Sequence, residues 1–430
     1  MTTATPDPNF SAPPITQVGP IAWLRKNLFN GVFNSILTIV CALVIYSIIS
    51  SLLTWAFTAA EWQVLSSNIQ LFFVGRYPAE LIWRAWMTFS VVVGLAGLTW
   101  GILSRGDRLF SSVSIGLLGA FAIICYGLSM IAGGNSVREA CDASGSCLGR
   151  YLVSGFTAVP QLWGMLVLLV VSGLIGRAVG IKTPNVGSWL PLTWFISFFV
   201  IFWLLEGGLF LREVDLSRLG QTGLLLTLLT AIVSIVLSFP IGVLLALGRQ
   251  SPLPVVRSVS VAYIEVIRGL PLIGILFMAQ VMLPLVLPVG LNIPTLFRAM
   301  AGLTIFSSAY LAENVRGGLQ SIPRGQVEAA KALGLNGALL TLLIVLPQAL
   351  RAVIPTIVGQ FISLFKDTSL LYIVGLAELV GISQSILSNP NFLGKHSEVY
   401  LFVAVIYFVF CYAMSFASRR IEKQLGVGQR

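Results

Sequence analysis

The sequence predicts an all-α polytopic membrane protein, and composition and hydropathy patterning carry that prediction. Of its 430 residues, 57% are hydrophobic and only 10% are charged, whereas soluble domains carry about 25% charged residues. The apolar runs are long and unbroken, while spanning β-strands would be short segments of alternating hydrophobicity. A bilayer core about 30 Å thick needs about 20 apolar residues per helix, so the chain has room for about ten transmembrane helices.

We place the spans where the apolar runs lie. In chain order they are 33–57, 84–103, 109–132, 158–177, 189–210, 221–247, 259–283, 295–313, 350–379 and 398–417. The segment 1–20 is rich in Thr, Pro and Ser and has no charged stretch followed by an apolar core, so it does not read as a secretory signal. We expect it to be a disordered cytoplasmic tail.

The net charge of +10 does not by itself indicate a nucleic-acid partner, and we expect none. Lys and Arg of membrane proteins gather in the cytoplasmic loops. With the N-terminus inside, fifteen basic residues fall in inside segments and eight in outside segments. This bias predicts that both termini lie in the cytoplasm.

The chain divides into two halves of five predicted spans each, joined by the polar stretch LREVDLSRLG (211–220). Glycine and proline interruptions and charges at membrane depth gather in the second half. We therefore expect residues 21–210 to be an accessory membrane region and residues 211–430 to carry the function.

A short polar helix is predicted inside the second half, within IPRGQVEAAKALGL (322–335). Pro323 suits a first helical turn, and Gly334 is suited to end the helix. Small side chains keep the helix slim, so it could enter a groove on another protein. An amphipathic helix lying on the membrane surface is the alternative.

The order of residues in this segment resembles the EAA loop of permease subunits in binding-protein-dependent ABC importers. Glu328, Ala329 and Ala330 are followed by Gly334 and then by the sequence IVLP, which ends at Pro347. The resemblance implies that the loop 317–347 forms a coupling helix that docks on an ATPase subunit. The implied coupling residues are Arg324, Gln326, Glu328, Ala329, Ala330 and Gly334.

Flanking stretches narrow the resemblance. YIEVIRGLPL (263–272) and FKDTSL (365–370) resemble the polar amino-acid subfamily, over roughly residues 219–426. FFVGRYPAELIWRAW (72–86), in the first half, is similar to the M-type permease subunit of bacterial general L-amino-acid import systems. The resemblance implies that the C-terminal five helices form an ABC-importer permease core.

The implied function is that of a permease subunit in an ATP-driven importer, which moves L-amino acids from the periplasm across the bacterial inner membrane. Its implied partners are a homologous second permease, two ATPase subunits, a periplasmic amino-acid-binding protein and the lipid bilayer. The sequence has no Gly-x-x-x-x-Gly-Lys-Ser/Thr loop. We therefore expect no enzyme and no cofactor bound by this chain, with ATP and Mg used by the partner ATPase.

A stand-alone, ion-coupled secondary amino-acid transporter is the alternative function. Such proteins often show inverted repeats and broken helices around a midplane site. No internal repeat is evident in this sequence.

Ionisable residues at membrane depth mark candidate path residues, because they are costly there. Lys366 and Asp367 are followed by Thr368 and Ser369. The two charged groups could meet the carboxylate and ammonium of a zwitterion, or could pair with each other as a structural site. Two further candidates share one helix face: Gln360 and Ser363.

Two Glu/Arg pairs at a spacing of three residues are expected to support a gate or the coupling loop. They are Glu265 with Arg268, and Glu313 with Arg316.

Cys141 and Cys147 flank a short external loop and are disulfide candidates, with two free thiols as the alternative. Their spacing is not a zinc pattern, and His396, the single histidine, is far away in the sequence. We expect no metal site.

Overall fold

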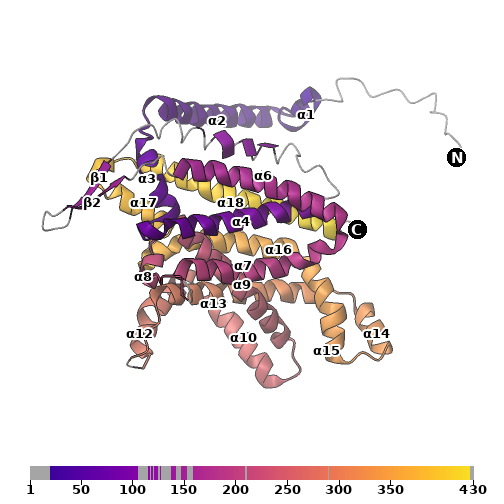
Figure 1. The fold of residues 1–430 in the computed structure, drawn as a ribbon. Helices are drawn as coiled ribbons and strands as arrows, with labels where there is room; N and C mark the ends of the chain where they lie inside the picture. Colours follow the sequence, from indigo (N-terminus) through magenta and orange to yellow (C-terminus); the bar gives the residue numbers. More distant parts are fainter. Residues whose placement is uncertain are drawn as a thin grey trace. The chain divides into compact units, whose positions relative to one another are not determined.

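The computed structural model is almost entirely helical (Figure 1). It describes residues 20–104, 115–116, 118–119, 121–123, 126, 137–141, 147–152, 158–208, 211–288 and 290–426. Residues 1–19 of the predicted tail and most of the predicted span 109–132 lie outside the described residues.

The elements of the first half are α1 (Pro20–Asn27), α2 (Val32–Thr58), α3 (Gln63–Val74), η2 (Ala79–Leu81), α4 (Ile82–Leu103), β1 (Val137–Cys141), β2 (Cys147–Leu152), α6 (Ala158–Lys182), η4 (Pro184–Trp189) and α7 (Leu190–Glu206). The elements of the second half are α8 (Leu216–Leu219), α9 (Leu224–Arg249), α10 (Pro254–Gly269), α11 (Leu272–Phe277), η5 (Met278–Met282), α12 (Leu283–Val286), α13 (Thr295–Gln320), α14 (Arg324–Ala332), α15 (Gly337–Leu340), η6 (Thr341–Val345), α16 (Leu346–Asp367), η7 (Thr368–Val374), α17 (Leu379–Leu387), η8 (Pro390–Phe392) and α18 (His396–Leu425).

The chain forms two compact units, one ending at Glu61 and the other beginning at Trp62. In the first unit, α2 is an apolar helix of 27 residues with no buried side chain. Such a helix can cross a bilayer with its whole circumference in lipid. It matches the predicted span 33–57.

The prediction of an all-α polytopic membrane protein is confirmed. Six helices of the described residues are long and apolar enough to cross a membrane, or seven if the bent pair formed by α10 and the helices after it is one span. A shorter apolar helix, Leu192–Glu206, corresponds to the predicted span 189–210. The predicted number of about ten spans is approximate.

The predicted span 259–283 is not one straight helix. The structure breaks it into Pro254–Gly269 and Leu272–Val286, which meet at 106°. Pro271 has no N–H to donate and disfavours a helical conformation at the residue before it. Accordingly, Leu270 and Pro271 both have extended ψ angles, 140° and 141°.

The helix at the predicted span 350–379 begins before residue 350, and its last part is a 3₁₀ segment and not an α-helix. Helix starts at Gly337, passes through the π-helical turn Thr341–Val345 and continues as α16 to Asp367. Pro355 lies inside α16 without ending it. The change occurs at Thr368, where a 3₁₀ segment begins and runs to a left-handed Gly375.

The core of the second unit draws on both halves of the sequence. Its largest cluster of buried residues includes Phe72 of α3, Leu205 of α7, Leu226 of α9, Leu303 of α13 and Val399 of α18. The boundary at 210/211 is therefore not a break in packing. As a division between an accessory region and a functional core, it stays a prediction.

Close backbone contact joins α4 to α6. Gly97 and Gly101 of α4 form a GxxxG pair, and a Cβ on Gly101 would collide with the carbonyl oxygen of Gly173. A Cβ on Gly176 of α6 would likewise collide with the backbone of Leu98. Small residues at this spacing let membrane helices approach closely.

Candidate functional site

The predicted polar helix is present as α14, and its ends have the expected geometry. Pro323 is the N-cap residue, and the helix runs from Arg324 to Ala332. Gly334 has a φ of +79°, and its N–H donates to the carbonyl of Lys331 over 2.9 Å. The N–H of Leu335 donates to the carbonyl of Ala330 over 3.2 Å, so the helix ends in the glycine motif that the sequence indicated.

The surface of α14 is open. Five of the six predicted coupling residues are exposed, and the sixth, Ala330, is only 4% exposed. α14 contacts α15 and the following π-helical turn (Figure 1). The helix therefore presents its polar residues outward from a fixed base.

An apolar residue that the sequence reasoning missed stands at the end of this helix. Leu333 is 82% exposed. Leu342 and Leu343, 55% and 60% exposed, follow on the helix that starts at Gly337. Leu342 and Leu343 belong to the candidate membrane span Gly337–Val374, where lipid can cover them, whereas Leu333 lies outside that span.

A cluster of five charged residues ties α9, α10 and α13 together: Arg249, Glu265, Arg268, Glu313 and Arg316. Glu313 of α13 contacts Arg249 of α9 at 3.4 Å and Arg268 of α10 at 3.8 Å. It also accepts a hydrogen bond of 2.7 Å from Nε of Arg316. Glu313 is thus shared by three arginines.

Of the two predicted Glu/Arg pairs, one forms and one does not. Glu313 and Arg316 are bonded as their spacing indicated. Glu265 instead bonds Arg249 over 2.9 Å, and Arg268 lies over the ring of Tyr310 at 5.6 Å while reaching Glu313. Helical spacing favours a pair on one face, but a carboxylate on a neighbouring helix competes for the same arginine.

The predicted path residues lie at the end of α16 and the start of η7. Lys366 is exposed, while Gln360, Ser363, Asp367 and Ser369 are half-buried. Among the described contacts, no ion pair within 4 Å joins Lys366 to Asp367. Adjacent residues on a helix point about 100° apart, which separates their charged groups.

Thr368 differs from its neighbours because its side chain is fully buried. Its hydroxyl donates to the carbonyl of Phe365 over 2.7 Å. The hydroxyl thus closes the junction between the α-helix and the 3₁₀ segment. The Thr368 side chain therefore does not reach the surface on which Lys366 is exposed.

A buried carboxylate that the sequence reasoning missed lies just beyond this junction. Glu378 is 0% exposed and caps α17, with its oxygens accepting from the N–H groups of Val380 (2.9 Å) and Gly381 (3.0 Å). The hydroxyl of Tyr407 on α18 lies 3.4 Å from the same carboxylate. Thr227 of α9 accepts from the N–H of Leu379 over 3.2 Å. Glu378 therefore holds the start of α17 between α9 and α18.

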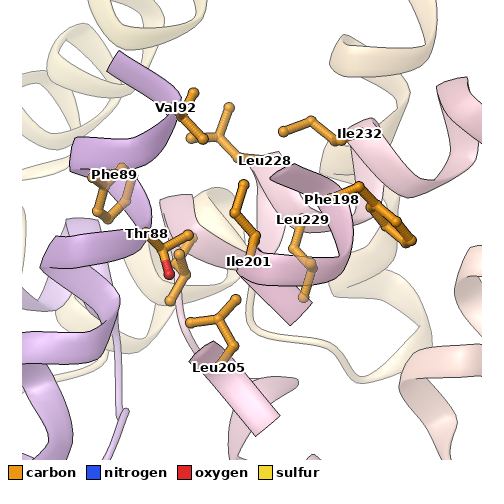
Figure 2. A pocket seen from close by; sticks show the side chains of 10 residues that line it. Thr88, Phe89, Val92, Phe198, Ile201, Leu205, Leu228, Leu229 and Ile232 are labelled. Carbon is orange, nitrogen blue, oxygen red and sulfur yellow. The ribbon is translucent and has the colours of Figure 1, made fainter. Parts of the chain in front are cut away.

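A small pocket between the two halves of the chain is apolar (Figure 2). It is lined by side chains of α4, α7 and α9, with Phe89, Phe198 and Leu229 among them. Its one polar side chain, Thr88, donates its hydroxyl to the carbonyl of Arg84. The charged groups of a zwitterion would find no hydrogen-bonding or ionic partner there, so this pocket is unsuited to a polar substrate.

The family model for "binding-protein-dependent transport system inner membrane component" matches residues 238–427. The inner membrane amino-acid ABC transporter permease protein YhdY of Escherichia coli is 36% identical over 95% of this chain and 94% of its own length. The chain belongs to the family of amino-acid ABC transporter permeases.

Two more relatives of this permease differ in length. The glutamate/glutamine/aspartate/asparagine transport system permease protein BztC of Rhodobacter capsulatus is 34% identical over 96% of this chain and 95% of its own length. The probable glutamine ABC transporter permease protein GlnP of Bacillus subtilis is 40% identical over 46% of this chain and 90% of its own length. Some permeases of the family thus match only about half of this chain.

The two disulfide candidates of the permease lie on the paired strands of a hairpin among the described residues. β1 and β2 pair in antiparallel fashion, and the backbone register sets Cys141 opposite Cys147. The residues between them, 142–146, lie outside the described residues. The disulfide itself stays a prediction.

Among the described residues of the permease, no group of three or more His, Cys, Asp or Glu side chains could hold a metal ion. Glu378 could have been found from the sequence, because it is an ionisable residue at the end of the predicted span 350–379. Leu333 carried no such signal, since a single leucine in a membrane protein is ordinary until its exposure is known.

Proposed function

We propose that this permease forms the transmembrane path of an ATP-driven importer that moves L-amino acids from the periplasm into the cytoplasm. The observation that carries the proposal is the structure of α14. This helix exposes Arg324, Gln326 and Glu328, bears the EAA sequence and ends at a glycine with φ of +79°. The similarity of the whole chain to amino-acid permeases of about the same length supports this function over a stand-alone ion-coupled transporter.

The contacts of the loop suggest how work done on α14 would reach the path. α14 follows α13 directly, and the helix that starts at Gly337 leads into α16, which ends at Asp367. Glu313 of α13 holds Arg249 and Arg268, so a shift of α13 would also move α9 and α10. Rigid helices and shared ion pairs are suitable carriers of such coupling.

ATP hydrolysis takes place in a separate subunit in this proposal, and ATP and Mg belong to that subunit. Two ATPase subunits would dock on the α14 of this permease and of a homologous second permease. A periplasmic amino-acid-binding protein would deliver the substrate. This arrangement requires α14 to lie in the cytoplasm, and the distribution of Lys and Arg predicts that both termini lie there as well.

The substrate would pass the face that carries Lys366. Its ammonium could bind the carboxylate of an amino acid, while Asp367 could bind the ammonium group. Ser369, Ser363 and Gln360 offer half-buried hydrogen-bonding groups beside them.

Reconstitution of the complex tests the function. The permease, co-expressed with its second permease, ATPase and binding protein, should import labelled L-amino acids into liposomes only when ATP reaches the ATPase. Competition with a panel of unlabelled amino acids would define the substrates. Uptake by the permease alone, driven by an ion gradient, would instead establish the secondary transporter.

A substitution in the coupling helix tests the docking role. Gly334→Asp should abolish ATP-driven uptake, because it adds charge and bulk at the end of α14 and strains a backbone with φ of +79°. Gly394→Asp is the matched control, since Gly394 has φ of +83°, is exposed and has open space around its Cα. Normal uptake by Gly334→Asp, or equal loss in both variants, would rule out the docking role.

A further inference from the structure

Three segments that are far apart in the sequence meet at one turn, residues 220–223, which leads into α9. On one side, the N–H of Ala377 donates to Gly220 over 2.9 Å, and the N–H of Gly223 donates to Ala377 over 3.1 Å. On the other side, the N–H of Arg76 donates to Gln221 over 2.8 Å. The turn is therefore held by the residue two before α17 and by the residue two after α3, and these two helices also contact each other.

The side chain of Arg76 extends this contact directly to α17. One guanidinium nitrogen, Nη1, donates to Oε1 of Gln221 over 3.1 Å. The other, Nη2, donates to Oγ of Ser385 over 2.9 Å. A planar guanidinium with several fixed donors suits such a bridge, whereas a lysine ammonium offers a single point of attachment.

Glycines set the backbone separation that allows the bridge. Gly75 has φ of +52°, and a Cβ there would lie 2.5 Å from Cα of Thr222. Gly223 has φ of +59°, and a Cβ there would lie 2.5 Å from the carbonyl oxygen of Phe72. No other residue fits such an approach, so the position of Arg76 against the turn is fixed by the backbone.

The helix that Arg76 holds lies next to the candidate path. α17 follows and contacts the 3₁₀ segment Thr368–Val374, and the buried Glu378 is its N-cap residue. A displacement of α17 would therefore reach this segment, which carries Ser369 and continues directly from Lys366 and Asp367 at the end of α16.

We propose that Arg76 is a positioning residue, through which the first half of the chain holds α17 and the end of the candidate path in place. In its bearing on transport, this inference rests on the proposed function. It gives a structural role to residues 21–210, which the sequence predicted to be an accessory membrane region.

The chain offers a matched control for Arg76. Arg212 bonds Glu80 over 2.8 Å, with side chains that are 74% and 78% exposed. Like Arg76, it belongs to the polar segments outside the candidate spans. Its partner Glu80 belongs to η2, so removing the Arg212 side chain takes no hydrogen bond from α17.

Hydrogen exchange tests the bridge without requiring transport. In the purified full complex, Arg76→Ala should make amides of the peptide 376–388 exchange about tenfold faster, as expected for the loss of a bridging hydrogen bond. Arg212→Ala should leave that peptide unchanged. Equal exchange in wild type and Arg76→Ala would overturn the proposal, even if the complex imports no amino acid.

Uptake tests the consequence for the path. Arg76→Ala should lower the maximal rate or raise KM at normal assembly, Arg76→Lys should recover part of the loss, and Arg212→Ala should match wild type. In a double-mutant cycle, Ser385→Ala should add little to Arg76→Ala, because the two share one hydrogen bond. If Arg76→Ala does not assemble, the cycle is run with Arg76→Lys. Full additivity, or uptake unchanged in every variant at normal assembly, would overturn the proposal.

Discussion

Single buried polar groups fix the geometry of this molecule at the residue scale. Glu378 is fully buried, but its two oxygens accept from two N–H groups and lie near the hydroxyl of Tyr407. A buried carboxylate is tolerated only when such donors surround it. The same carboxylate starts α17, so its removal would leave the first amides of that helix without partners.

Truncating this side chain should destabilise the permease. Glu378→Ala is expected to cost about 1–3 kcal/mol, because it leaves two buried N–H groups unsatisfied. Glu378→Gln should cost less, since the amide oxygen still accepts one of them. The temperature at which half of the purified complex aggregates is the measurement. Asp215→Asn is the control, because Asp215 caps α8 through the N–H of Ser217 at an exposed site. An equal, small shift in all three variants would contradict the capping role.

Glu313 should matter more to coupling than its neighbour Glu265. Glu313→Gln leaves Arg249, Arg268 and Arg316 without their shared carboxylate, whereas Glu265→Gln removes one partner at a side chain that is 55% exposed. We expect lower uptake per ATP hydrolysed in Glu313→Gln and near-normal coupling in Glu265→Gln. The ratio of uptake to ATPase rate in liposomes measures this. A larger loss in Glu265→Gln would show that the cluster is not centred on Glu313.

At the scale of elements, the structure depends on how closely helices approach each other. α4 and α6 meet through Gly97, Gly101 and Gly176, with no room for a Cβ at the contact. Without a hydrophobic driving force between helices in lipid, close packing of this kind holds them together.

A larger side chain at the glycine contact between α4 and α6 should separate the two helices. Gly101→Leu inserts a side chain where even a Cβ collides with backbone, and overpacking costs about 1–3 kcal/mol or more. Gly164→Leu is the control, because Gly164 lies on α6 with open space around it. Gly101→Leu should lower the aggregation temperature and the yield of assembled complex, while Gly164→Leu should not. Equal behaviour of the two variants would contradict the close contact.

The hairpin of β1 and β2 should carry a disulfide. Its register sets Cys141 opposite Cys147, and a periplasmic location would be oxidising. Mass spectrometry of the loop peptide, prepared without reductant and with free thiols alkylated, should find the two residues linked. Two alkylated cysteines would refute the link. Removing the bond should change stability little, because the loop it closes is short.

The sequence predicted those helices that are determined by their own residues, through hydropathy or through residues that begin and end a helix. Hydropathy located α2, α4 and α9 to within a few residues, and proline, small residues and glycine located α14. It did not predict α3 and α17, which are too short to stand out in a hydropathy profile and owe their place to packing against α9 and α18. The GxxxG pair of α4, Gly97 and Gly101, is present in the sequence, but the helix that it contacts is known only from the structure.

Partner choice, in contrast, was beyond the sequence. Glu265 was expected near Arg268 but bonds Arg249 on another helix. The predicted span 259–283 was given as one helix, and the break of 106° at Pro271 depends on the packing around it as well as on the proline.

At the scale of the whole molecule, the two halves of the sequence share one core. Buried residues of α3, α4 and α7 belong to the same cluster as those of α9, α13 and α18. A permease that matches only about half of this chain still belongs to the family. In this chain the first half packs into the same core as the second, and Arg76 is one point at which the two are joined.

The last prediction concerns the path through the whole complex. If Lys366 and Asp367 only stabilised each other, either single neutralisation would be harmful and the double change would restore folding and transport. The described contacts include no ion pair between them, and Lys366 is exposed while Asp367 is half-buried. We therefore expect the double variant, Lys366→Met with Asp367→Asn, to assemble normally but to transport poorly. Uptake normalised to assembled complex, with the ATPase present, measures this. Near-normal uptake by a well-assembled double variant would show that the pair is structural, and that the substrate crosses the membrane along other residues.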